Sequence, residues 1–209
     1  SAMQASDRNT SFFRLCVRNL LSLIVLNLLF LLTCLPVLTL PAGWTALSSA
    51  CQHILLEEKG LYRRFWRDFC RNFFPSLLFG AVFFAGPALA LYGCRFYYRL
   101  SEGAGIAVAL SCFCLIGSYL LLCVGAFAFQ MQARVMLRVS DVLKNAICLT
   151  FHTPRVVLGW LLLSVALAAA LVLLLPYSLP WVVLLGGSLP CFAATRGVLP
   201  IIDAYIVKE

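Results

Sequence analysis

Residues 27–47, NLLFLLTCLPVLTLPAGWTAL, decide the fold, because they are apolar and yet contain two prolines and a glycine. They belong to a run of 38 residues without charge, Asn19–Leu56. A helix needs about 20 residues to cross a bilayer, so this run is long enough for two crossings. Proline removes a backbone donor and disfavours helix at the residue before it. We therefore expect the chain to cross a membrane, turn near Pro41–Gly43 and return.

The composition excludes an ordinary soluble domain. Hydrophobic residues make up 63% of the 209 residues, charged residues only 11%, and the mean hydropathy is +0.97. A soluble domain carries about 25% charged residues. Lipid is therefore the natural solvent, and residues 1–209 are expected to form a single transmembrane domain. The ten cysteines lie mostly inside apolar runs, where they act as small hydrophobic residues and not as a disulfide framework.

The remaining uncharged runs give the other membrane helices. Asn72–Cys94 and Gly103–Ala133 are long enough for one crossing each. Val156–Thr195 is long enough for two, with Pro176 and Pro180 marking a tight turn. The sequence predicts an all-α, polytopic transmembrane bundle of about six membrane helices, plus an interfacial helix. The expected spans are 18–40, 43–59, 74–95, 104–130, 155–175 and 180–199.

The distribution of cations favours six spans. With six, Arg95 and Arg99 lie outside, and the other fourteen Lys and Arg residues share one face with both termini. With five, the division is five against eleven. Cytoplasmic loops carry the excess of Lys and Arg, so both termini are expected to be cytoplasmic. Helix 43–59 is barely long enough to cross, and a re-entrant or tilted interfacial helix is the alternative.

Residues 61–74, LYRRFWRDFCRNFF, predict a basic amphipathic helix on the cytoplasmic side. Aromatic residues recur along one face, and the arginines take the other. Such helices lie in the headgroup layer, where cations meet anionic lipid, and the same surface could receive an acidic partner. The alternative is an anchor that only retains charge inside. The expected contact residues are Arg63, Arg64, Trp66, Arg67 and Arg71. No nucleic-acid partner is expected, because the cations flank the membrane segments.

The sequence offers few groups that could carry out catalysis. All eight acidic residues lie at the ends of the chain or between the predicted spans, and no nucleotide-binding or zinc-protease motif occurs. We expect no catalytic residue, no cofactor, no metal site and no enzyme activity. Polar residues inside the predicted spans are candidates to line a narrow path; the alternative is that they bond the backbone or a neighbouring helix. They are Asn27, Ser111, Ser118, Tyr119 and Ser164.

Several stretches resemble the YesL-like family of bacterial membrane proteins. The opening stretch resembles that family's first-span signature, although Pro41 stands where the family pattern has glycine. RFWRDFCRNFFPSLL resembles its aromatic-basic segment, and VLKNAICLTFHTPRVVLGWLLL and LLGGSLPCFAATRGVLPIIDAYI resemble its later stretches. The residues of the opening stretch that fit are Asn27, Leu35, Pro36, Val37, Thr39, Ala42, Thr45, Ala46 and Leu47.

The resemblance implies a bacterial inner-membrane protein of unestablished activity. Members of that family often accompany carbohydrate-uptake systems with ABC-type sugar permeases. The function it implies is therefore an accessory role in carbohydrate uptake beside such a permease. The alternative hypothesis is an autonomous small transporter or channel, favoured by the polar residues inside the spans. The sequence leaves the ligand and the oligomeric state open.

Overall fold

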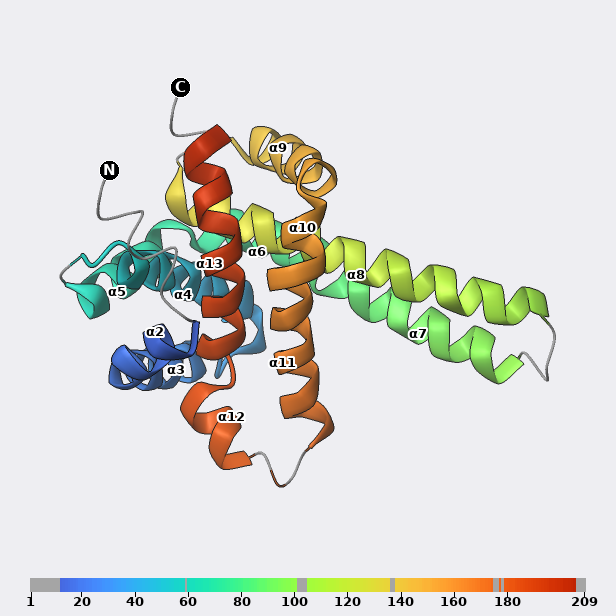
Figure 1. Ribbon diagram of the computed structural model, residues 1–209, viewed down its shortest axis with the longest axis horizontal. Helices are drawn as coiled ribbons and strands as arrows, with labels where there is room; N and C mark the ends of the chain where they lie inside the picture. Colours follow the sequence, from blue (N-terminus) through green and yellow to red (C-terminus); the bar gives the residue numbers. More distant parts are fainter. Residues whose placement is uncertain are drawn as a thin grey trace.

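The computed structural model describes residues 12–58, 60–100, 105–135, 138–174, 177 and 179–205, and every regular element in these ranges is helical (Figure 1). The predicted all-α class is confirmed. The elements are α2 (Phe12–Arg18), α3 (Leu20–Thr33), η1 (Val37–Thr39), α4 (Leu40–Leu55), α5 (Leu61–Arg71), α6 (Phe73–Phe83), α7 (Ala85–Leu100), α8 (Gly105–Arg134), α9 (Val139–His152), α10 (Pro154–Val156), η2 (Val157–Leu161), α11 (Leu162–Leu173), α12 (Leu179–Leu185) and α13 (Ser188–Tyr205).

Three helical stretches are long and apolar enough to cross a membrane: Phe73–Arg99, Gly105–Arg134 and Pro154–Leu173. Two further stretches qualify only as bent pairs, α2 with α3 at 74° and α12 with α13 at 47°. The described residues thus give three to five candidate spans, and the predicted number of about six is not confirmed. The ends of the chain, on which the predicted placement of the termini depends, lie outside the described residues.

The chain does turn back after α3. Phe30 of α3 packs against Trp44 of α4 with ring centroids 5.9 Å apart, and Arg18 before α3 pairs with Glu57 after α4 at 2.9 Å. Early residues of the first helix therefore meet late residues of the second, so α3 and α4 run antiparallel. The predicted reversal exists.

The position of the turn was predicted wrongly. The chain reverses over Cys34–Thr39, where the Thr39 amide donates to the Pro36 carbonyl at 2.9 Å. Pro41 lies in the first turn of α4, a position that needs no amide donor and suits the fixed φ of proline. Sequence reasoning took Pro41 as the end of a helix, whereas it begins one.

Helix α4 is the centre of the molecule and not a surface-exposed span. It has 16 residues, of which twelve are buried, and it contacts α3, α5, α6, α8 and α13. Close approach of α6 requires Gly80, because a Cβ there would lie 2.1 Å from Cγ of Pro41. The predicted second span, 43–59, is therefore a short helix enclosed by other helices.

Two pairs of helices extend from this core in different directions (Figure 1). One is the hairpin of α7 and α8, and the other is α11 with α12, in which α11 packs on α13 and α12 packs on α3. The half of α8 from Cys123 onward is buried in the core, whereas the preceding half packs mainly on α7. At the base of α11 the helix widens into the π-helix η2, and the Tyr119 hydroxyl donates to the Val157 carbonyl there.

Candidate functional site: a polar pocket beside the arginine-rich helix

Asn27 bridges α3 to the break between α12 and α13. Its Nδ2 donates to the carbonyls of Val182 (3.0 Å) and Val183 (2.7 Å), and its Oδ1 accepts from the amides of Gly187 (2.7 Å) and Ser188 (3.1 Å). The side chain is completely buried. A broken helix leaves amides and carbonyls without partners, and this one side-chain amide bonds four backbone groups at the break. Among them, the Val182 carbonyl also accepts from the Gly186 amide at 3.0 Å.

The other four polar residues predicted along a path also bond backbone carbonyls. Ser111 donates to Ala107, one turn earlier in the same helix, and Ser118 donates to Pro87 of α7. Ser164 donates to Pro190 of α13. With Tyr119 at the π-helix, the set is distributed over separate helix contacts, so a path through them stays a prediction.

Helix α5 is attached to α4 through its buried side and presents its arginines on the other side. Phe65 and Asp68 are its buried residues, and the Ser49 hydroxyl of α4 donates to Asp68 Oδ2 at 2.5 Å. Arg71 and Arg67 approach the same carboxylate at 3.3 and 3.6 Å. Burial of a carboxylate is costly unless it is bonded and paired. Asp68 is hydrogen-bonded through Oδ2, whereas Oδ1 has the two arginines as ion-pair partners but no hydrogen bond.

The predicted contact residues lie on the exposed side of α5. Arg63, Trp66, Arg67 and Arg71 are exposed, and Arg64 is half-buried. Trp66 stacks on Phe69 with ring centroids 5.6 Å apart, so one flank of the exposed side is aromatic. The predicted aromatic face is therefore divided: Phe65 enters the core, and Trp66 stays at the surface.

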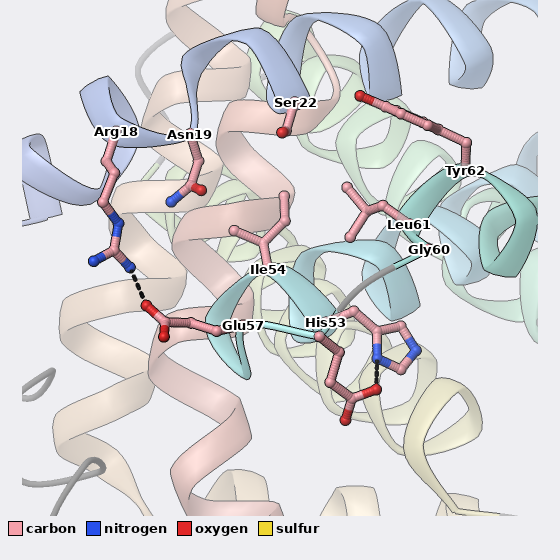
Figure 2. Close-up of a pocket in the computed structure, with 10 residues that line it drawn as sticks. Arg18, Asn19, Ser22, His53, Ile54, Glu57, Gly60, Leu61 and Tyr62 are labelled. Atoms are coloured by element: carbon pink, nitrogen blue, oxygen red, sulfur yellow. Dashed lines mark hydrogen bonds and ion pairs between the residues drawn. The ribbon is translucent and has the colours of Figure 1, made fainter.

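A polar pocket of about 460 Å³ lies beside the start of α5 (Figure 2). Three separate segments line it: the junction of α2 and α3, the end of α4, and the loop that leads into α5. The lining residues are Arg18, Asn19, Ser22, His53, Ile54, Glu57, Glu58, Gly60, Leu61 and Tyr62.

Ion pairs join the walls of the pocket. Arg18 pairs with Glu57 at 2.9 Å across the α2–α4 boundary. Glu58 accepts from Arg64 of α5 and lies 3.0 Å from His53 Nδ1, which is also 3.2 Å from Arg64 Nη1. Burial lowers the pKa of His53 from its ordinary 6.5 despite the neighbouring Glu58. Burial alone would raise the pKa of Glu58, but His53 and Arg64 lower it below its ordinary 4.5.

Sequence reasoning did not find this pocket. Its residues come from three segments, and no motif relates Arg18 to Glu57 or Ser22 to Tyr62. The only local signal is Gly60, which adopts φ 85° between an acidic helix end and an arginine-rich helix. Within the described ranges, no three side chains among His, Cys, Asp and Glu gather to hold a metal ion.

Residues 23–93 match the family model described as protein of unknown function, DUF624. The match covers α4 and α5 completely, together with most of α3 and the first part of the α7 hairpin. It therefore includes most of the central helices and one side of the pocket, but about two thirds of the chain lies outside it. No curated protein and no solved structure matches the chain.

Proposed function

We propose that the protein is a multi-pass protein of a bacterial inner membrane that serves as an accessory component of carbohydrate uptake. Its partner is an ABC-type sugar permease, as the resemblance to the YesL-like family implies. The observation that carries the proposal is the exposed surface of α5, with Arg63, Trp66, Arg67 and Arg71. A surface of this kind suits an acidic protein partner or anionic headgroups, and both are expected to contact it.

The attachment of α5 supports a docking role. The buried contacts of Phe65 and Asp68 hold the helix against α4, so its arginines need little ordering on binding. The polar residues inside the bundle are committed to internal hydrogen bonds, as Asn27 illustrates with four backbone partners. Both features are those of a scaffold that presents a surface.

Crosslinking in native membranes tests this proposal. A photo-crosslinking amino acid replaces Trp66, and cells grow on a glycan as the sole carbon source. We expect a permease subunit to be recovered. The matched control carries the same group at Ile106, which is 80% exposed near the tip of the α7–α8 hairpin. Recovery of no permease from Trp66, or equal recovery from both positions, would contradict the accessory role.

The proposed orientation has its own test. Reporter domains that are active on only one side of the membrane are inserted after Gly60 and at the carboxyl end of the chain. We expect cytoplasmic activity at both sites, because the Lys and Arg excess lies with them. Opposite sides for the two insertions would remove the cytoplasmic docking surface.

An autonomous transporter is the second candidate, and the break between α12 and α13 favours it. Transporters build substrate sites around discontinuous membrane helices. Here the two parts meet at 47°, around Gly186 and Gly187. Proteoliposomes that contain only this protein should then take up labelled maltose or sodium faster than protein-free liposomes. Failure to take up either would eliminate this candidate and leave the accessory role standing.

A further inference from the structure

We propose that the pocket beside α5 binds a small, neutral, polyhydroxylated ligand, the size of one or two sugar rings. Its volume of about 460 Å³ lies within the range of small-molecule sites, roughly 300–1,000 Å³. The proposal concerns a site on this chain and does not depend on a permease partner. Either idea can fail while the other stands.

The arrangement of charge selects a neutral ligand. The described lining holds one cation and two carboxylates, and these are already paired: Arg18 with Glu57, and Glu58 with His53 and with Arg64 behind it. Because each of these charged groups already has a partner of opposite sign, a charged ligand would have to displace one of the pairs. Hydroxyl groups need not displace a pair, because each can donate to a carboxylate and accept from an arginine.

The opposite wall adds uncharged hydrogen-bonding groups. Figure 2 shows Asn19, Ser22 and Tyr62 on the side of the pocket that faces Glu57 and His53. Asn19 uses its Nδ2 on the Leu15 carbonyl, which leaves the amide oxygen as an acceptor. Hydroxyls and an amide between two ion pairs form a mixed donor and acceptor lining, which a ligand rich in hydroxyl groups can satisfy.

The apolar lining fits the carbon skeleton of such a ligand. Ile54 and Leu61 belong to the lining, and the Tyr62 side chain is 49% exposed. A sugar ring has polar edges and a face of C–H groups, which packs on an aromatic or aliphatic surface. An ionic headgroup would gain less from this surface.

The end of α4 places the carboxylates at the pocket wall. Glu57 has φ 55° and is the left-handed residue that closes the helix, where the Glu57 amide donates to the Ile54 carbonyl at 3.2 Å and the Glu58 amide donates to the His53 carbonyl at 3.0 Å. The helix therefore ends beside Arg18, which pairs with Glu57 at 2.9 Å.

Ligand titration by saturation-transfer NMR tests the site, on the full chain in lipid nanodiscs. The probes are D-glucose, maltose and myo-inositol. We expect saturable binding of at least one, with glucose 6-phosphate and glucosamine binding at least tenfold more weakly than glucose. Glu57→Gln and Tyr62→Ala should weaken binding at least tenfold. Arg63→Ala, on α5 but outside this lining, should change it less than twofold.

Ser22→Val is a second, independent test of the site, because it alters the pocket from α3 and leaves the segment between α4 and α5 unchanged. It should weaken binding while the melting temperature stays that of the wild type. The proposal is overturned if none of the three neutral probes saturates, if a charged analogue binds more tightly, or if the pocket variants bind like Arg63→Ala. Trp66 crosslinking to a permease is independent of all these outcomes.

Discussion

Helix α8 is one continuous helix in two environments. In a soluble protein the apolar part of a helix is buried and the polar part is exposed, and in α8 the reverse holds. Its most apolar 18-residue window is only 17% buried, and before Cys123 only Ser111 and Ser118 are buried. The following residues, from Cys123 to Ala133, are mostly buried and include Gln130 and Gln132. The most apolar part therefore faces outward, and the more polar part forms the core.

Helix α4 extends the same contrast. It is enclosed on all sides and carries Thr45, Ser48, Ser49 and Gln52 among its buried residues. Gln52 Nε2 donates to both the backbone and the side-chain oxygen of Gln130 at 2.8 Å. Lipid is as apolar as leucine, so hydrophobicity cannot drive helices together; close packing and hydrogen bonds do. The core is where those bonds are made.

The largest expected effect comes from removing Asn27. Asn27→Ala removes the hydrogen-bond partner of three backbone groups at the α12–α13 break, the Val183 carbonyl and the amides of Gly187 and Ser188, and each buried unpaired group costs about 1–3 kcal/mol. The free energy of unfolding should fall by about 3 kcal/mol or more, measured by equilibrium unfolding in mixed micelles. Ser111→Ala, on the outward half of α8, should cost less than about 0.6 kcal/mol. Equal losses would show that the two environments do not differ.

The sequence predicts where the helices lie better than it predicts which of them are buried by other helices. Hydropathy located the long apolar stretches because lipid-facing segments have to be apolar along most of their length. The same signal misjudged α4, since a 16-residue helix with polar residues reads as a weak span and is in fact the centre. Pro41 shows the limit of the sequence signal: a proline can end a helix or begin one, and Pro41 lies in the first turn of α4.

The candidate sites also differ in how well the sequence predicts them. The arginines of α5 were predictable from helical periodicity, because they share one element. The role of Asn27 was not, because its partners lie about 155 residues away in sequence. Asp68 likewise reads as one charge in a basic helix until Ser49 of α4 is placed beside it. Long-range pairs of this kind carry no local pattern, and the pair of Arg18 with Glu57 that joins two walls of the pocket is one of them.

Glycine substitutions in the core and in the outward half of α8 are expected to change the free energy of unfolding by intermediate amounts. Gly80→Ala places a Cβ 2.1 Å from Pro41 Cγ, and such overpacking costs about 1–3 kcal/mol of unfolding free energy. Gly117→Ala, in the outward half of α8, meets nothing within 4 Å and should stabilise by up to about 1 kcal/mol through helix propensity. The double variant Pro41→Ala with Gly80→Ala should recover part of the loss. A stabilising Gly80→Ala would show that α4 and α6 are loosely packed.

The smallest expected effect is a dependence on pH that belongs to the pocket. The pKa values of His53 and Glu58 are both below their ordinary 6.5 and 4.5, so the folded state binds fewer protons than the unfolded state. Stability is therefore fully present above pH 6.5 and decreases as the pH falls, first through His53 and then, below pH 4.5, through Glu58. The melting temperature should fall modestly when the pH is lowered from about 7.5 to about 5.

His53→Gln isolates the source of this dependence, because it removes the group that titrates first and keeps a hydrogen-bonding side chain. The variant should melt at nearly the same temperature at pH 7.5 and at pH 5, over roughly the range in which an unperturbed histidine titrates. Arg99→Gln, near the end of α7 and far from the pocket in the fold, should keep the wild-type slope. If His53→Gln kept the wild-type slope, or if Arg99→Gln abolished it, the dependence on pH would not come from the pocket.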